Sequence, residues 1–474
     1  MPVKYDRPGA FQLGAVNLVS YTSIDDSGTP KRLDIRNLIV EFNIYEDLKS
    51  PFLSGDITLI DGTNAIQDLP ITGFERLEFF FRTPGTTKGF DFSIKSGHPM
   101  FVYALENRQG ANPRSQMYTL KFISLEAIRD NQTRVSQAFA GSTDQMILDI
   151  CYNYLKTKKD VLVEETKGVS KYVIPRVKPI TAIKYLSKNA RALHYENSGF
   201  LFYENAHGFQ FKSYEGLFCK KDGSPRPIKA HYSPKVKNTG EDDIYNLQSV
   251  EDFRILSQFN TLLNTNNGVY SSRLITHDLY NKLFETHDFD YNIEYPKQNH
   301  LEMDAKGDKI DNNGILPFFN YDRGETFGSK NEGALYYQSE TRKVHNDYEF
   351  PESKDILQKR VSQHLAVNAL NIEITVPGST EVNIGDIVHF SMPKFAPKTE
   401  NDRKDQDVYL TGRYLISAAR HQVSIVSKKH TLVLELVKDS FNRAYPEEII
   451  DLFTENEDDT GSAYSATELD EFVK

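Results

Sequence analysis

The sequence contains no tryptophan and only two cysteines among its 474 residues. Two cysteines, Cys151 and Cys219, are too few for a disulfide framework, so packed apolar cores must hold the fold together. Cys151 falls among apolar residues at helical spacing, which is typical of a small core residue. We therefore expect a protein that is made in a reducing cytoplasm.

Long hydrophobic runs and an excess of positive charge are missing as well. No apolar run approaches the roughly 20 residues that a membrane-spanning helix needs. The first eight residues lack the apolar core of a signal peptide. The formal net charge of −10 argues against a general nucleic-acid-binding surface, because such a surface requires clustered lysine and arginine. We therefore expect no membrane span and no specific binding of DNA.

Motifs for catalysis and cofactor binding are also absent from the sequence. No segment matches a phosphate-binding glycine loop, a dinucleotide fingerprint or a nucleophile elbow. The twelve histidines are scattered, and pairs such as His277 with His287 or His421 with His430 do not have helical metal-binding spacing. The sequence therefore predicts no enzyme activity, no catalytic residue, no cofactor and no bound metal.

Two acidic segments superficially resemble functional sites. Residues 304–314 resemble a calcium loop, but the alternating acidic ligands before the glycine and the closing glutamate are absent. Asp288 and Asp290 lie two residues apart, which on a strand places both side chains on one face. No partner motif accompanies either segment, so a solvated loop and an ordinary strand are the favoured interpretations.

What the sequence does contain is a series of closely spaced strand signals. Apolar and polar residues alternate from Leu370 to Val376, and turn chemistry follows at Pro377–Ser379. Further strand signals begin at Ile387, at Val408 and at His430. Such spacing is typical of the wall of a small antiparallel barrel.

A similar pattern of alternation covers the N-terminal part of the chain, from Leu38 to Phe122, and predicts another β-rich domain. The period changes near residue 140, where helical spacing begins with the capping sequence Ser142–Gln145, and a second helix begins at Pro179. A hairpin is predicted between Phe200 and Phe211. We therefore expect a mainly β protein with two antiparallel barrels and α+β insertions.

These patterns predict the domain boundaries. The predicted domains are a first barrel at residues 1–130, an α+β inserted module at 131–245, a discontinuous second barrel at 246–290 and 352–440, a loop-rich insertion at 291–351 and an acidic C-terminal tail at 441–474.

Several residues are expected to shape structural turns between strands. They are Gly55, Gly73, Gly268, Gly378, Gly385, Asp386 and Gly412. At Gly385 we expect a positive φ, because it lies at a turn between two barrel strands.

Six segments, taken in this order, carry a family resemblance. They are Ile35–Asp61, Leu69–Glu75, Gly268–Asp278, Val376–Pro393, Leu410–Ile416 and Thr431–Asp439. Together they resemble the baseplate hub protein of T4-type contractile-tailed phages, whose fold is similar to the base of type VI secretion spikes. Residues 290–350 and the acidic tail match no motif of that family.

The resemblance implies two tube-type barrels in each chain, a homotrimer and an axial channel through which DNA passes. It implies as partners a central spike protein, the tail tube or a tube-initiator protein, and baseplate wedge proteins. It also implies a place in the tail baseplate of a virion, after assembly in the host cytoplasm. From the net charge of −10 we expect the channel to be acidic or neutral.

Two alternatives remain open. A tail-tip hydrolase or carbohydrate-binding protein would need a cleft lined with aromatic residues and paired carboxylates, and the missing tryptophan weighs mildly against it. The base of a secretion spike often carries the spike in the same chain, but the sequence after residue 440 is too short to form one.

Overall fold

The fold is mainly β with α+β insertions, as the sequence predicts, and the largest sheet contains fourteen strands. Two hydrophobic cores support this sheet, one in each barrel, and the second core extends into the inserted module. The structure, a computed structural model, describes residues 8–25, 28–86, 89–234, 248–279, 281–302, 320–321, 325–326, 334–340, 352–394, 406–407 and 409–441.

The first barrel is built from antiparallel strands around an aromatic core. Its strands, in the order of their pairing, are β4 (Ile39–Asp47), β5 (Ser54–Asp61), β10 (Ser115–Ser124), β9 (Met100–Asn112), β6 (Arg76–Glu78), β2 (Asn17–Ile24) and β3 (Pro30–Asp34). Phe42, Phe79 and Phe122 pack edge to face inside it. Gly55 is required there, because an added Cβ would lie 2.2 Å from the ring of Phe122.

The second barrel has its own closed ring of strands. In the order of their pairing they are β16 (Ile228–Pro234), β25 (Ile387–Phe390), β26 (Gly412–Ser424), β27 (Lys429–Lys438), β24 (Leu370–Pro377) and β18 (Asp252–Ser257). The short β17 (Ser249–Val250) pairs with β16 and leads directly into β18, which closes the ring. The alternation predicted for β24 is present, with Leu370, Ile372, Ile374 and Val376 all buried.

The two barrels repeat the same topology. Strands β4, β5, β10, β9 and β6 pair in that order, and strands β18, β24, β27, β26 and β25 pair in the equivalent order. The long hairpins also match: β9 and β26 have 13 residues each, and β10 and β27 have 10. Both hairpins carry a bulge at the same place, at Tyr103 in β9 and at Ser417 in β26.

The inserted module follows the first barrel through α2 (Leu125–Gln132). Its elements are β11 (Val135–Gly141), α3 (Thr143–Asp149), the π-helical turn η2 (Ile150–Tyr154), β12 (Val161–Val163), β13 (Ser170–Val177), α4 (Pro179–Lys188), β14 (Phe200–Asn205), β15 (Gly208–Ser213) and α5 (Tyr214–Phe218). The helix starts at Ser142 and Pro179 and the hairpin between Phe200 and Phe211 lie where the sequence places them. Cys151 is buried in this module, and Cys219, which directly follows α5, is buried as well.

Two segments pair differently from the predicted domain boundaries. Strand β16 lies within the predicted inserted module, yet it pairs with β25 of the second barrel. Residues 271–290 were expected in the second barrel, yet β19 (Ser271–Asp278) and β20 (Leu283–Asp290) form a separate sheet with β23 (Leu335–Glu340). Alternation of apolar and polar residues identifies a strand but not the sheet that the strand joins. In β19 the side chain of Leu274 is buried, and α9 (Ser353–Val367) packs against this strand. Gln358 of that helix donates to the Ser272 carbonyl at 2.8 Å.

The buried side chains of Lys159, Glu126 and Glu204 connect the inserted module to the first barrel. The Nζ of Lys159 lies 2.8 Å from Glu126 Oε2 and 2.6 Å from Glu204 Oε1. Glu204 also accepts hydrogen bonds from Leu53 N and Ser124 Oγ of the first barrel. Burial raises the pKa of Glu204, whereas the two carboxylates raise the pKa of Lys159 against the opposing effect of its burial.

Replacing Lys159 by methionine should destabilise the protein strongly, because two buried carboxylates would lose their common counter-ion. We expect a loss of about 3–5 kcal/mol in the free energy of unfolding, measured by urea titration. The exposed neighbour Lys158 provides the matched control, and Lys158→Met should change stability by less than about 0.5 kcal/mol. Equal effects of the two substitutions would contradict the role of the buried charges.

Candidate functional site

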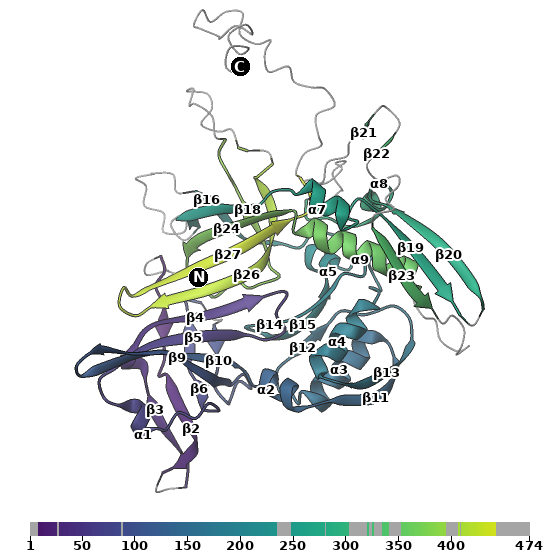
Figure 1. The fold of residues 1–474 in the computed structure, drawn as a ribbon. Helices are drawn as coiled ribbons and strands as arrows, with labels where there is room; N and C mark the ends of the chain where they lie inside the picture. The colour runs from purple at the N-terminus through teal and green to yellow at the C-terminus, as the bar shows by residue number, and fades with distance from the viewer. Residues whose placement is uncertain are drawn as a thin grey trace, which may run out of the picture.

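The two barrels share one strand, β26. Its first residues, Gly412–Leu415, pair with β25 of the second barrel, and its last residues, Ala418–Ser424, pair with β4 of the first. Its opposite edge pairs with β27. Figure 1 shows the yellow β26–β27 hairpin of the second barrel lying directly over purple β4. The junction is therefore a continuous hydrogen-bonded sheet, not a flexible linker.

The N-terminal segment completes the junction from the other side. Strand β1 (Gln12–Leu13) pairs with β7 (Phe80–Arg82) of the first barrel. Just before β1, the Gly9 carbonyl accepts a hydrogen bond from His430 N of β27 at 2.8 Å. The N-terminal segment thus links the β26–β27 hairpin of the second barrel to β7.

A pair of fully buried histidines lies at the centre of the junction. His421 of β26 and His430 of β27 are stacked at 5.3 Å, and a hydrogen bond of 3.2 Å joins His421 Nδ1 and His430 Nε2. Phe90 contacts His421 and Phe81 contacts His430, each at a centroid distance of 4.9 Å. One face of the hairpin therefore packs against the aromatic core of the first barrel, while the turn at its tip is exposed.

The surroundings of His430 favour a neutral imidazole. Burial and the adjacent His421 ring hold the pKa of His430 well below its ordinary value of 6.5. The carboxylate of Glu46 lies near the pair, with its Oε2 3.9 Å from His421 Nε2. Gly378 is required beside the pair, because an added Cβ would lie 2.1 Å from the His430 ring.

The contact between these two histidines was missed by sequence reasoning, which treated them as scattered polar residues. The hairpin register contains the signal, because Val423 lies opposite His430 and His421 lies opposite Leu432. Both histidines therefore occupy the same face of neighbouring strands at diagonal positions. Placing the turn at residues 425–428 would have been sufficient to find the contact.

The predicted turn residues lie in several parts of the fold, and the structure does not bring them together into one site. Gly73 and Gly268 have φ of +83° and +74°, and Gly385 has φ of +83°. An added Cβ at Gly385 would lie 2.7 Å from the hydroxyl of Tyr203 in the inserted module. Asp386 forms the turn with Gly385, accepting from Asn383 N at 3.1 Å, and burial raises its pKa.

Gly412 lies beside a second buried ion pair. Glu302 Oε1 is 2.9 Å from Lys438 Nζ and accepts from Arg413 N at 2.7 Å. With φ of +144° and Glu302 Oε1 only 1.8 Å from an added Cβ, position 412 admits no side chain. This ion pair joins the segment after β20 to the start of β26 and the end of β27 in the second barrel.

The features that could suggest catalysis do not form a reactive constellation. Asp288 is held by Arg273 in a surface ion pair of 2.7 Å, and His277 Nδ1 is bonded to the hydroxyl of Tyr337 at 3.0 Å. Residues 304–314 lie outside the described part of the chain. Where the structure is described, no group of three histidine, cysteine or acidic side chains could hold a metal ion. None of the helices described here is long and apolar enough to span a membrane.

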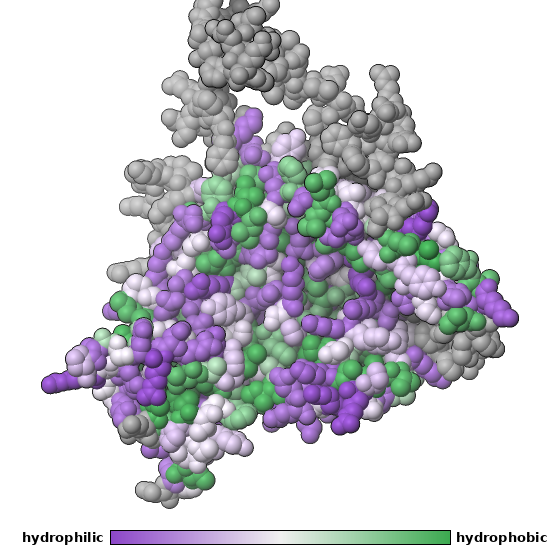
Figure 2. All heavy atoms as spheres, in the orientation of Figure 1, coloured by the Kyte–Doolittle hydropathy of each residue, from purple (hydrophilic) through white to green (hydrophobic). Residues whose placement is uncertain are grey.

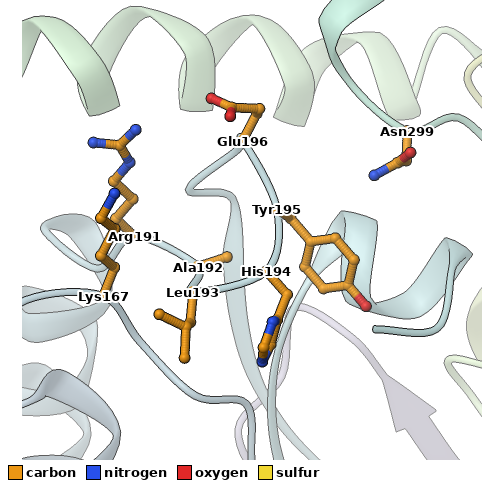
Figure 3. A pocket seen from close by; sticks show the side chains of 8 residues that line it. All are labelled: Lys167, Arg191, Ala192, Leu193, His194, Tyr195, Glu196 and Asn299. Atoms are coloured by element: carbon orange, nitrogen blue, oxygen red, sulfur yellow. The ribbon is translucent and has the colours of Figure 1, made fainter. Parts of the chain in front are cut away.

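A polar pocket of about 170 Å³ opens on the inserted module. Figure 3 shows Arg191 and Glu196 directed to one side and His194 and Tyr195 to the other, so the polar groups do not converge. His194 Nε2 lies 3.0 Å from Glu165 Oε2. The same carboxylate oxygen lies 3.0 Å from Lys221 Nζ. The pocket therefore offers neither a nucleophile with its base nor a pair of facing carboxylates.

Comparison with known proteins identifies the fold. Neither a protein-family model nor a curated protein sequence matches the chain. A tail protein from Neisseria meningitidis MC58 matches with a TM-score of 0.50 and 12% identity, over 92% of this chain and 100% of that chain. The 43 kDa tail protein of prophage MuSo2 from Shewanella oneidensis gives a TM-score of 0.47 and 11% identity, over 91% and 100%. A type VI secretion system component from E. coli gives 0.40 and 8%, over 93% and 80%.

At 12% identity, the likeness to the Neisseria protein shows a shared fold and no more. The neighbour whose TM-score reaches 0.50 is a tail protein, and its fold agrees with the tail-protein fold that the sequence resemblance implies.

The buried histidine should make the protein sensitive to acid. Above pH 6.5 His430 is neutral in both folded and unfolded chains; below it, only the unfolded chain takes up the proton. Stability should then fall as pH decreases, by up to about 1.4 kcal/mol per pH unit until the lowered folded pKa is reached. Between pH 7 and pH 5, the free energy of unfolding of His430→Gln, measured by urea titration, should fall by up to about 2 kcal/mol less than that of the unsubstituted chain.

A matched control for this experiment is Val426→Gln, at an exposed position in the turn of the same hairpin. It should keep the same loss between pH 7 and pH 5 as the unsubstituted chain. A His430→Gln variant with an unreduced loss would mean that this histidine does not stay neutral in the folded chain.

Gly385→Ala should be destabilising by about 1–3 kcal/mol, because alanine would be strained at φ of +83° and would press on Tyr203. Thermal unfolding of the purified variant measures the effect. Gly62→Ala is the control, since an added Cβ there meets atoms only at 3.8 Å or more. Identical melting of the two variants would contradict the steric requirement at Gly385.

Proposed function

We propose that this chain is the structural hub of a contractile phage tail baseplate. Three copies form a ring that joins the six-fold tail tube to a three-fold central spike and surrounds the DNA channel. The chain has no catalytic activity of its own, and it acts in the virion tail after assembly in the host cytoplasm. Its partners are the spike, the tube or a tube-initiator protein, and the wedge proteins of the baseplate.

The observation that carries this proposal is the repeated barrel within one chain. Two barrels with equivalent strand order lie edge to edge and share a hydrogen-bonded sheet through β26 and β4. Three such chains in a closed ring would present six similar barrels. Closed cyclic symmetry is the usual arrangement of soluble oligomers, because open head-to-tail contacts would grow into filaments. A six-fold tube could then stack on one face of the ring.

The insertions provide the three-fold character. In Figure 1 the inserted module and the β19–β20–β23 sheet both lie to the right of the two barrels. Each occurs once per chain, so a trimer would carry three copies of each beside its six barrels. Buried ion pairs fix the inserted module at Lys159 and the segment after β20, through Glu302, at Lys438. A three-fold spike can dock where such features repeat three times.

The channel of this ring should be acidic or neutral. DNA that passes through a tube must not adhere to it, and contacts from lysine and arginine to phosphates are what cause adhesion. The net charge of −10 agrees with this expectation.

The similarity in fold to the Neisseria tail protein supports the proposal that this chain is a tail hub.

Light scattering of the purified chain tests the proposal. The expected mass is three times the 54.2 kDa of one chain, independent of dilution over a wide range of concentration. The matching assay for activity is incubation with peptidoglycan, which should remain uncleaved. A chain that stays monomeric or dimeric at every concentration, alone and with phage spike protein, would contradict the hub function.

A further inference from the structure

We propose that the ring closes when the outer half of β9 in one copy pairs with β18 of the next copy. The inference rests on the proposed function for the existence of a ring, but it assigns the surfaces from the internal repeat. The partner of each surface is therefore a second copy of this chain.

The intrachain junction supplies the template. There the last residues of β26, Ala418–Ser424, extend beyond their own barrel and pair antiparallel with β4. The repeat makes β9 the equivalent of β26 and β18 the equivalent of β4. Within one chain this contact is made once, from the second barrel to the first. Its equivalent, from the first barrel to a second barrel, has to involve another copy.

Both surfaces have unpaired edges in the described part of a single chain. Strand β9 pairs with β6 only at Met100 and Phe101, and from Glu106 to Asn112 all its side chains are exposed. Strand β18 pairs with β24 along one edge only, and it exposes Ile255 and Leu256. Figure 1 shows the β9–β10 hairpin projecting from the body of the molecule, and Figure 2 shows its strongly polar tip at the left. Exposed strand edges of this kind are ready-made sites for pairing with another chain.

The side chains at equivalent positions are complementary. In the intrachain junction, Arg420 Nε donates to Asn43 Oδ1 at 3.0 Å, and Gln422 Nε2 donates to Glu41 Oε1 at 3.0 Å. The strand registers make Glu106 equivalent to Arg420 and Arg254 equivalent to Asn43. An arginine–amide contact inside the chain becomes a glutamate–arginine contact between copies.

The second contact keeps its chemistry. By the same registers Gln109 is equivalent to Gln422, and Asp252 is equivalent to Glu41. An amide therefore faces a carboxylate in both junctions. Within one copy Glu106 contacts Lys121 at 2.7 Å and Arg254 contacts Glu373 at 3.0 Å, both on the surface, so the new contacts would extend existing ion pairs.

A charge exchange tests the pairing. Glu106→Arg places two arginines together and Arg254→Glu places two glutamates together, so each should weaken trimer formation at least about tenfold in analytical ultracentrifugation. The double variant, Glu106→Arg with Arg254→Glu, should recover trimer formation. Lys184→Glu, an exposed charge change on α4, is the control and should leave assembly unchanged.

A covalent readout avoids dependence on the strength of one ion pair. Gln109→Cys combined with Arg254→Cys, at positions equivalent to the directly opposed Gln422 and Asn43, should form disulfides between copies on oxidation and give a covalent trimer in denaturing electrophoresis. The native cysteines, Cys151 and Cys219, are buried and should not interfere. A trimer that neither responds to the charge changes nor forms this crosslink overturns the strand pairing and leaves the hub function standing. A chain that remains monomeric and forms no crosslink contradicts both.

Discussion

The architecture depends on one strand that serves two barrels. Strand β26 pairs first with β25 and then with β4, so hydrogen bonding continues without interruption from one barrel to the other. Backbone groups that are buried at this junction need partners, and the neighbouring barrel provides them. The fully buried pair of His421 and His430 fixes the hairpin among the phenylalanines of the first barrel. A rigid pair of barrels follows from these contacts, and a ring of defined geometry requires such rigidity.

Buried charges perform the same task for the insertions. Lys159 holds two carboxylates from different parts of the chain, and Lys438 holds Glu302 beside Gly412. Each arrangement is costly to disrupt, because removing one partner leaves an unpaired charge in an apolar region. The inserted module and the segment after β20 are thus fixed to the barrels at specific points, and their positions would repeat with each copy in an assembly.

The strands of both barrels were largely predictable from the sequence, because alternation in segments such as Leu370–Val376 directly reports a half-buried strand. The partners of those strands were not predictable. Residues 271–278 carry a strand signal and form a strand, yet they join a separate sheet with β20 and β23. Strand β16 shows the same limit, since its partner β25 lies far away in the sequence.

Tertiary contacts also decide the importance of single residues. Gly385 is recognisable as a turn residue from its context, whereas the need for Gly378 appears only when the ring of His430 lies against it. The contact between Lys159 and its two glutamates joins residues 33 and 45 positions apart, and no local pattern indicates it.

In the proposed hub, one chain supplies two equivalent barrels to a closed ring. Electron microscopy of the purified protein, with two-dimensional class averages of particles viewed along the axis, distinguishes such a ring from other assemblies. We expect a ring of six similar lobes around a central hole, with three additional features that repeat once per chain. Isolated two-lobed particles, or open filaments in place of rings, would contradict it.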